Sequence, residues 1–515
     1  MAYSVLIKNG TILDGTGGDL YKADIGIVGD KIKDIGDLKK SSAEKVIDAS
    51  NLYVTPGFID LTSHSDTYWT LFSAPGQESM LMQGVTTILL GNCGESLAPI
   101  IKKESFAALE RWSTAPSLNA NWNTVKEYLE TIEKIGIGVN TATMVGQETL
   151  RRGAQNLEET TLLLTRAIKD GAWGLSSNFS FVEWSGKLDN ETVSLLNTIA
   201  AFDGIYKVHL RDEGKDFLPA IASVVNLIRR SKVKTVLSHF KGVGKSAWRD
   251  FDKAVTMVRS AQQDGLPIYF DFSPYLRTGS MLVSLLPQWA RTGDSQVILE
   301  RLHNPITAEK IISNLRSFTL HPERYLIASA VNDRSMVGKT LEEITNGSGR
   351  SLEENIVEIL KINNLSVNIL GKTVSGRNIL QAAKEPWAVV ATDGAGLNIE
   401  MEKSGNLTHP RSFGTYARYF SKIGPKAGVS PQVAIRQSSL LPAELTGIPK
   451  RGKIAKGFFA DIAVFHPEEF KDNGTYKNPY HYASGMIHVL VGGKHAVENG
   501  KISGKRFGKV IKKTA

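Results

Sequence analysis

The chain has 515 residues, of which 42% are hydrophobic and 22% are charged, and its formal net charge is +9. This balance is typical of a folded globular protein and excludes a disordered one, and the length predicts two or three structural units. The single cysteine, Cys93, excludes an intramolecular disulfide framework.

The chain carries no feature of a membrane or nucleic-acid-binding protein. Its first residues, Met1–Lys8, lack a basic stretch followed by a long apolar one, so we expect no secretory signal and a cytoplasmic location. No apolar run approaches the roughly 20 residues of a membrane helix. Basic residues cluster in the last fifteen positions without interleaved aromatic residues, which favours a solvated surface. We therefore expect neither nucleic acid nor membrane as a partner.

Both ends of the chain predict short β-strands. Runs of apolar or alternating residues stand next to Asn-Gly, Gly-Asp and Gly-Gly turn signals at Ser4–Ile7, Ala23–Val28, Lys31–Ile35, Asp461–Phe465 and Ile487–Val491. Because chain termini often lie close together, we predict that residues 1–55 and 440–515 pair into one small β-sandwich domain.

The region between the ends predicts an α/β fold. Short apolar strands, mostly separated by room for a helix, start near Phe58, Val85, Val139, Trp173, Ile205, Val233, Ile268 and Trp387. Repeated strand–helix units favour a parallel sheet with both faces covered, and eight of them close into a (β/α)8 TIM-like barrel. We assign residues 56–439 to this barrel. An insertion at about 281–386, with helices at Thr307–Leu315 and Leu352–Ile362, separates the seventh and eighth strands.

Polar side chains follow several of these strands at the point where each strand ends. Cys93 follows the second strand, His209 the fifth, His239 the sixth and Asp393 the eighth. Catalytic groups of β/α barrels lie at the carboxyl ends of strands. His209 and His239 are one strand–helix unit apart, so their side chains can reach the same ion.

These residue types predict a zinc site. Zinc prefers tetrahedral nitrogen and sulfur ligands, and a catalytic zinc keeps one position open for water. Cys93, His209 and His239 would supply three ligands and leave the fourth position free. The ion would lower the pKa of bound water and polarise a carbonyl oxygen, while Asp393 would accept the proton and return it to the leaving nitrogen.

Each residue also has a structural interpretation when it is taken alone. A lone cysteine such as Cys93 is usually a small buried hydrophobe, a histidine at a strand end is often hydrogen-bonded, and Asp393 before Gly394 can shape a turn. Their joint position at strand ends favours the metal site. Six other histidines fall in the insertion or the terminal domain, where we expect surface or structural roles: His303, His321, His466, His481, His488 and His495.

The motifs around these residues resemble the D-aminoacylase, or N-acyl-D-amino-acid deacylase, branch of the amidohydrolase superfamily over nearly the whole chain. They are Pro56–Asp60, Gln83–Thr87, Gly91–Gly94, His209–Gly214, Ser238–Gly242, Thr392–Gly394, His409–Thr415 and Gly457–Asp461. The cysteine ligand is the most specific of them, because most amidohydrolases use a carboxylated lysine there.

The resemblance implies roles for further residues. It places one tightly bound zinc on Cys93, His209 and His239, makes Asp393 the general base and keeps His64 as a second catalytic group. Substrate binding through the carboxylate is implied for Lys241, Tyr275 and Arg411, since charge-assisted hydrogen bonds fix both position and charge.

Three positions depart from the family pattern. Thr62 replaces the first histidine of Asp-x-His-x-His, so a second, weaker metal position would lack a ligand. Gln147 replaces a histidine after the third strand. Phe181 replaces a tyrosine, and the loss of one oxyanion donor costs on the order of 100-fold or more in rate.

The leading hypothesis is zinc-dependent hydrolysis of the amide bond of a small N-acyl-D-amino acid. One alternative is another linear or cyclic amide, such as a dipeptide or a hydantoin. A second alternative is a non-catalytic homologue, which Thr62, Gln147 and Phe181 motivate. Against this second alternative, the complete Cys/His/His/Asp set is retained.

Overall fold

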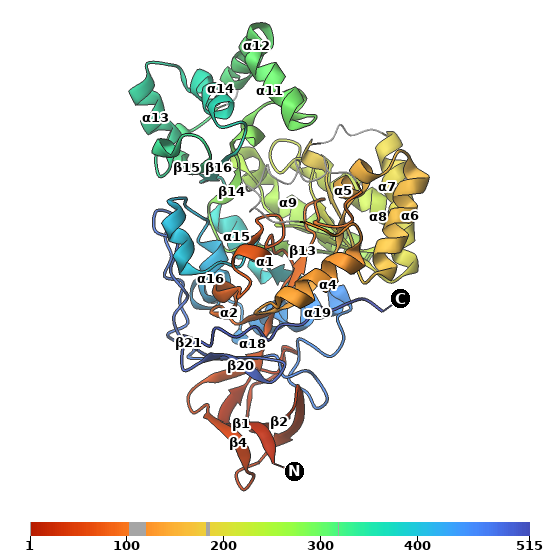
Figure 1. Cartoon of the computed structure of the whole chain (residues 1–515), viewed down its shortest axis with the longest axis vertical. Coiled ribbons are helices and arrows are strands. Elements are labelled where there is room, and N and C mark those ends of the chain that lie inside the picture. Colours follow the sequence, from red (N-terminus) through yellow and green to blue (C-terminus); the bar gives the residue numbers. More distant parts are fainter. Residues whose placement is uncertain (1, 102–119, 182–185, 318, 515) are drawn as a thin grey trace.

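The computed structural model describes residues 2–101, 120–181, 186–317 and 319–514. Figure 1 shows three regions along the longest axis of the molecule. A β-sheet built from strands near both ends of the chain lies at one end, parallel strands with surrounding helices lie in the middle, and a group of helices from the insertion lies at the other end. The C-terminus itself lies beside the middle region.

The middle region is built from parallel strands in two hydrogen-bonded sheets. One has the order β6-β7-β8 and the other the order β9-β10-β11-β12-β13-β17. Only Met144 separates β8 from β9, and a parallel bridge joins Ser63 to Gly394 after β6 and β17, so the strands follow one another around a ring that we call the barrel. The strands are β6 (Phe58–Asp60), β7 (Val85–Leu90), β8 (Asn140–Thr143), β9 (Val145–Gly146), β10 (Gly174–Asn178), β11 (Ile205–His209), β12 (Lys234–Leu237), β13 (Ile268–Phe272) and β17 (Ala388–Val390).

Eight of these nine strands begin within one residue of the positions expected from the sequence, and the two-residue β9 was not expected. The α/β class is confirmed. The strands are almost completely buried, which agrees with a sheet covered on both faces.

Helices between the strands cover the outside of the barrel. Helix α8 buries Phe217, Ile221, Val224 and Ile228, whose spacing of three and four residues puts them on one face. The covering helices include α4 (Val125–Ile135), α5 (Gln147–Gly153), α6 (Leu157–Lys169), α7 (Gly186–Ala201), α8 (Phe217–Ser231), α9 (Gly244–Gln263), α15 (Gly376–Lys384), α18 (Pro431–Ser438) and α19 (Leu440–Thr446).

Shorter helices complete the loops around the barrel. Helix α16, which begins at Arg411, follows the last strand. These helices are α1 (Thr70–Ser73), α2 (Glu78–Leu81), the short helices Phe179–Phe181 and Ile399–Ser404, α16 (Arg411–Arg418), a π-helical turn at Tyr419–Ile423 and α17 (Gly424–Ala427).

The insertion has its own apolar core, which runs from Met281 to Ile369. Its small antiparallel sheet has the order β14-β16-β15. The expected helices are found as α12 and α14. Helix α15, which the expected range of 281–386 also includes, contacts α9 and β13 of the barrel instead. The insertion comprises β14 (Thr278–Met281), α10 (Gln288–Arg291), α11 (Ser295–His303), α12 (Pro305–Arg316), β15 (Tyr325–Ala330), α13 (Leu341–Ser348), α14 (Leu352–Ile362), β16 (Val367–Gly371) and the short helices Leu282–Leu285, Pro322–Arg324 and Arg334–Met336.

The two ends of the chain contribute to one nine-stranded sheet, with the order β21-β20-β19-β18-β5-β1-β2-β3 and with β4 paired to β1. This hydrogen bonding differs from the two separate sheets that a sandwich implies, because β1 pairs with β2 on one side and with both β4 and β5 on the other. The strands are β1 (Tyr3–Ile12), β2 (Tyr21–Val28), β3 (Lys31–Gly36), β4 (Ala43–Asp48), β5 (Tyr53–Pro56), β18 (Ile462–Phe465), β19 (Met486–Val491), β20 (Lys494–Glu498) and β21 (Lys501–Ile502).

Strand β5 connects this sheet to the barrel. It pairs with β18 and is followed, after Gly57 alone, by the first barrel strand, β6. Among the described residues, we find no helix with the length and apolar character that a membrane crossing would need.

A pair of histidines, the buried His488 and the partly buried His495, is expected to make the terminal sheet sensitive to acid. The rings of His488 and His495 lie 6.1 Å apart, and neither His488 Nδ1 nor the two ring nitrogens of His495 has a hydrogen-bond partner. Burial, followed by the neighbouring His495, lowers the pKa of His488 from 6.5 to about 4. The folded state therefore binds fewer protons than the unfolded state between these values, and stability is lost as the pH falls through them.

We expect the His488→Leu variant to lose less stability than the wild type between pH 6.5 and 4.5. Denaturant unfolding across this range measures the difference. The exposed His303 of the insertion is the matched control, and His303→Leu should keep the wild-type pH dependence. Parallel loss of stability in His488→Leu and the wild type would contradict the role of His488.

Candidate metal centre and active site

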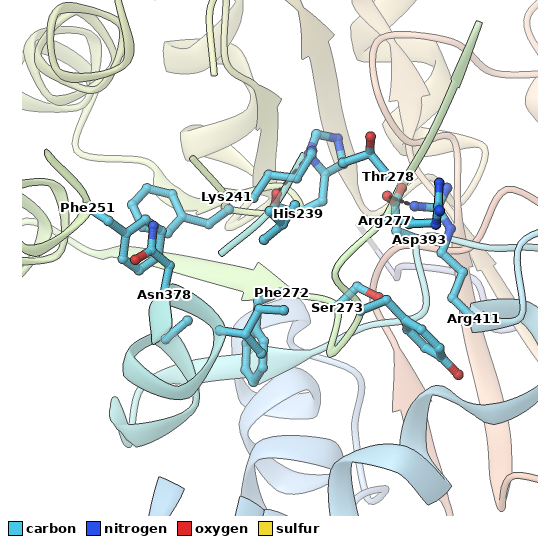
Figure 2. A pocket seen from close by; sticks show the side chains of 15 residues that line it. His239, Lys241, Phe251, Phe272, Ser273, Arg277, Thr278, Asn378, Asp393 and Arg411 are labelled. Atoms are coloured by element: carbon cyan, nitrogen blue, oxygen red, sulfur yellow. Dashed lines mark hydrogen bonds and ion pairs between the residues drawn. The ribbon is translucent and has the colours of Figure 1, made fainter. Parts of the chain in front are cut away.

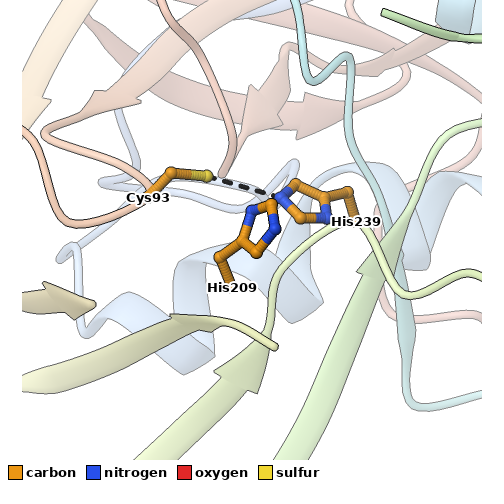
Figure 3. A group of neighbouring side chains, drawn as sticks. All are labelled: Cys93, His209 and His239. Carbon is orange, nitrogen blue, oxygen red and sulfur yellow. Dashed lines mark hydrogen bonds between the residues drawn. The ribbon is translucent and has the colours of Figure 1, made fainter. Parts of the chain in front are cut away.

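Cys93, His209 and His239 come together at the carboxyl ends of the barrel strands (Figure 3). Cys93 follows β7, His209 is the last residue of β11, and His239 follows β12. Cys93 Sγ lies 3.4 Å from His239 Nε2, and one ligand atom from each of the three residues lies within 4.8 Å of the others. The two imidazole rings are 4.5 Å apart at their centroids. The sequence prediction thus selected residues that share one site.

The backbone at this site is held in an uncommon conformation. The φ angles of Cys93, His239 and Asp393 are 52°, 39° and 51°, in the left-handed region that costs free energy for residues other than glycine. Gly94 is also in this region, and a β-carbon there would collide with the Glu148 carboxylate. Surrounding hydrogen bonds must stabilise these turns, because strain of this kind persists only where neighbouring structure imposes it.

The charges at this site are those of a cation-binding centre. Burial raises the pKa of the Cys93 thiol, but His239 and the hydrogen bonds from the histidines outweigh burial and hold the pKa well below its ordinary value. Burial and Lys241 lower the pKa of His239, yet Asp393 and Cys93 raise it to about 10. A buried thiolate and a buried carboxylate thus create negative charge that a metal ion would neutralise.

The donor geometry fits zinc. With Zn–S near 2.3 Å and Zn–N near 2.0 Å, tetrahedral coordination places a sulfur and a nitrogen ligand about 3.5 Å apart. The observed distance from Cys93 Sγ to His239 Nε2 is 3.4 Å. A cysteine and two histidines are also the ligand types that zinc prefers, and three protein ligands leave a fourth position open.

His64 and Asp393 adjoin the three metal-ligand candidates. His64 Nε2 lies 3.2 Å from Asp393 Oδ1 and 4.0 Å from Cys93 Sγ. The other carboxylate oxygen of Asp393 accepts a hydrogen bond from the Arg411 guanidinium. Burial raises the pKa of Asp393, but Arg411, His239 and His64 outweigh it and lower the pKa well below its ordinary value. Asp393 is therefore an ionised carboxylate that can accept a proton.

Glu213 and Lys241 surround the outer nitrogen of His239. Glu213 Oε1 lies 3.0 Å from His239 Nδ1, and Lys241 Nζ lies 2.6 Å from the same oxygen and 2.9 Å from Nδ1. Burial opposes ionisation of Glu213, but Lys241 lowers its pKa to about 2. A carboxylate on the outer nitrogen orients a metal-binding histidine and increases its basicity. Glu213 lies within the His209–Gly214 motif, but the sequence predicted no role for it.

A pocket lies beside His239 and Asp393, and its volume of about 430 Å³ includes space open to solvent (Figure 2). The predicted substrate-binding residues Lys241, Tyr275 and Arg411 all line it. Its wall is otherwise mixed, with aromatic and aliphatic side chains next to polar ones. These lining residues are Phe240, Phe251, Phe272, Ser273, Arg277, Thr278, Val374, Asn378, Ile379 and Ala382.

The Tyr275 hydroxyl has two protein partners in this structure. It donates to Asp472 Oδ2 at 2.9 Å and lies 3.3 Å from the Pro410 carbonyl oxygen. Asp472 comes from the C-terminal part of the chain, which the sequence interpretation did not connect to the pocket. A substrate carboxylate would have to displace one of these acceptors before it could accept a hydrogen bond from the hydroxyl.

The three departures from the family pattern fall at or near the same strand ends. The Thr62 hydroxyl donates to Asp271 Oδ2 at 2.8 Å and accepts from the Lys207 ammonium. Gln147 is buried and donates from Nε2 to Thr192 Oγ1 at 3.2 Å. Phe181 ends a short helix, and its side chain lies outside the described residues. The first two departures thus belong to internal hydrogen-bond networks.

Comparison with known proteins places the chain among hydrolases. No model of a protein family matches it. The D-aminoacylase of Alcaligenes xylosoxydans xylosoxydans is 27% identical over 526 residues, which cover 100% of this chain and 98% of that protein.

Two solved structures share the fold over the full length. The N-acyl-D-glutamate deacylase of Bordetella bronchiseptica, complexed with zinc and a phosphonate that mimics the tetrahedral intermediate, has a TM-score of 0.83 and 23% identity. It covers 99% of this chain and 100% of its own. A D-aminoacylase structure concerned with one-metal activation and second-metal attenuation has a TM-score of 0.82 and 25% identity, with 99% and 100% coverage.

Over its full length the chain is thus similar to D-aminoacylases and N-acyl-D-amino-acid deacylases, which are metal-dependent amidohydrolases, as the sequence motifs predicted.

Proposed function

We propose that this protein is a zinc-dependent deacylase that hydrolyses the amide C–N bond of N-acyl-D-amino acids. The observation that carries the proposal is the buried Cys93/His209/His239 donor set beside the Asp393 carboxylate in a pocket that also contains cationic side chains. The similarity to D-aminoacylase and to an N-acyl-D-glutamate deacylase supports the choice of substrate class.

Cys93, His209 and His239 would hold the zinc ion. When bound, the ion supplies Lewis acidity and a water molecule of lowered pKa at neutral pH. Glu213 fixes the orientation of His239 through Nδ1, so that Nε2 faces Cys93.

Asp393 carries the proton transfer. As an ionised carboxylate next to the metal-ligand candidates, it accepts a proton from the attacking water and then returns it to the leaving nitrogen. The amide C–N bond breaks as this nitrogen is protonated, and the products are a carboxylic acid and a free amino acid. His64, 3.2 Å from Asp393 Oδ1, and Arg411 on the other oxygen hold the carboxylate in place.

Arg411, Lys241 and Tyr275 are the groups that bind the substrate carboxylate. A guanidinium, an ammonium and a phenol in one pocket match an anionic group with charge-assisted hydrogen bonds. The apolar side of the pocket, with Phe251 and Phe272, would accommodate the non-polar parts of the substrate.

We propose that one metal ion suffices. A relative with the same fold is described in terms of one-metal activation and second-metal attenuation. In this chain the position of a second-site histidine is taken by Thr62, whose hydroxyl is bound to Lys207 and Asp271. A second ion would therefore lack a ligand and would meet a buried ammonium group.

In this proposal the active site lies at the carboxyl ends of the ring of parallel strands. We infer that this ring is the (β/α)8 barrel of the superfamily, which extends from β6 to α19 and carries the insertion from β14 to β16. The strands β1 to β5 and β18 to β21 form the small β domain in this assignment.

The decisive experiment incubates the zinc-loaded protein with a panel of N-acyl-D-amino acids, their L-enantiomers, dipeptides and hydantoins. Release of the free amine or amino acid is measured. We expect turnover of at least one N-acyl-D-amino acid and a preference over its L-enantiomer. Turnover of hydantoins or dipeptides alone would mean that the site hydrolyses a different class of amide. No turnover of any substrate would refute the proposed deacylase activity.

A further inference from the structure

A layer of buried charges lies against the metal-ligand candidates. Lys207 and Asp271 have 0% exposed side chains, and Asp60 is likewise completely buried. Lys207 Nζ lies 3.0 Å from Asp271 Oδ2, and it also donates to Thr62 Oγ1 and to the Leu61 carbonyl oxygen. This ammonium thus makes a complete set of three contacts inside the barrel.

Asp271 connects this layer directly to His239. Its Oδ1 accepts the backbone N–H of His239 at 2.6 Å, while Oδ2 binds Lys207 and Thr62. His239 has a φ of 39°, so its backbone needs a partner that stabilises the left-handed turn. The Asp271 carboxylate is that partner.

Asp60 makes the equivalent connection to Asp393. Its Oδ1 accepts the backbone N–H of Thr392 at 2.9 Å, and Oδ2 binds the Thr392 hydroxyl. Thr392 precedes Asp393, which has a φ of 51°. Two buried carboxylates therefore hold the backbone at two residues of the proposed site.

Buried carboxylates require a compensating cation. Taking an ion out of water is unfavourable, and a buried carboxylate without a partner would be displaced from the core. Lys207 meets this requirement, since it pairs with Asp271 and also interacts favourably with Asp60. A displaced Asp271 carboxylate could no longer hold the backbone of His239.

We propose that Lys207 is a positioning residue of the zinc site: its ammonium holds the Asp271 carboxylate in place, and Asp271 in turn holds the backbone of His239 in the conformation that presents its ring to the ion. The proposal rests on the proposed function, because it assumes that His239 is a zinc ligand. Lys207 itself contacts neither substrate nor ion.

Lys207→Met removes the charge but keeps most of the side-chain volume. We expect zinc affinity to fall at least 10-fold, measured by competition with a chelator at a temperature where the variant is folded, since loss of an outer partner of a metal ligand costs roughly 10- to 100-fold. Arg451→Met is the matched control, because it breaks a buried pair with Asp461 in the terminal part of the chain. This control should lose thermal stability but keep the wild-type zinc affinity.

The double variant Lys207→Met/Asp271→Asn tests whether Lys207 affects zinc affinity through Asp271. It restores neutrality, and the amide oxygen can still accept the His239 N–H. We expect folding and zinc affinity within about 3-fold of the wild type. If Lys207→Met alone does not fold, the folding and zinc affinity of the double variant still test the proposal.

Unchanged affinity in Lys207→Met would overturn the proposal, and so would a double variant that stays unstable or binds zinc as weakly as the single one. These outcomes are distinct from failure of the proposed function, in which the wild type itself would bind no zinc or release no amine.

Discussion

Asp393→Asn is expected to lower kcat for amide hydrolysis by about 1000-fold, with a small change in KM. General acid–base catalysis contributes typically 10²- to 10⁴-fold, and an amide in place of the carboxylate cannot accept the proton. Asparagine also tolerates the left-handed backbone at φ 51°, so the turn should persist. Steady-state kinetics with the best substrate of the panel measures the effect.

Zinc content is the control for Asp393→Asn. Because Cys93, His209 and His239 are unchanged, the variant should bind zinc as the wild type does. A variant that keeps full zinc and more than a tenth of the wild-type kcat would show that another group moves the proton. Loss of zinc in the same variant would instead make Asp393 a metal ligand.

Cys93→Ala is expected to abolish tight zinc binding and, with it, nearly all hydrolysis. Cys93 is the only thiol of the chain, and its pKa is held well below the ordinary value, so the thiolate is the strongest anionic donor at this site. Without it, two histidines remain, which is fewer than the three protein ligands typical of catalytic zinc. Metal analysis of purified protein should find about one zinc per chain in the wild type and almost none in the variant.

A substitution remote from the pocket provides the comparison for Cys93→Ala. His303 is exposed on α11 of the insertion, and His303→Ala should retain both zinc and activity. Zinc that stays bound after removal of Cys93, or is absent from both proteins, would refute the proposed ligand set.

The strand positions of the barrel were predictable because they depend on local pattern. Short apolar runs such as Val85–Leu90 and Ile268–Phe272 are buried on both faces, and their composition shows this directly. Chain-end strands such as β1 and β18 were also visible as alternating or apolar runs. Their association into one small β domain was predicted, but their arrangement as one branched sheet was not, since it depends on contacts between residues more than 400 positions apart.

The metal-ligand candidates were predictable because three ligand-type residues follow barrel strands at the same end. Glu213 was missed because its role depends on the orientation of the His239 ring, and sequence spacing does not predict that orientation. Lys207 did carry a signal. It stands two residues before His209 in β11, so both side chains point to the same face, and a lysine inside a buried strand requires an internal partner.

The position of Tyr275 shows a further limit of sequence reasoning. Its place in the pocket was expected, and it does line the pocket. Its partner Asp472 lies 197 positions away and reaches the pocket only in the folded chain. Interactions of this kind decide how freely a predicted binding group can meet its substrate.

X-ray absorption at the zinc edge of the wild-type protein determines the ligands of the ion. The proposed site predicts one sulfur at about 2.3 Å together with two imidazole nitrogens at about 2.0 Å and one further light atom. A shell of nitrogen and oxygen alone would exclude Cys93 as a ligand. Such a result would contradict the assignment of zinc to Cys93, His209 and His239.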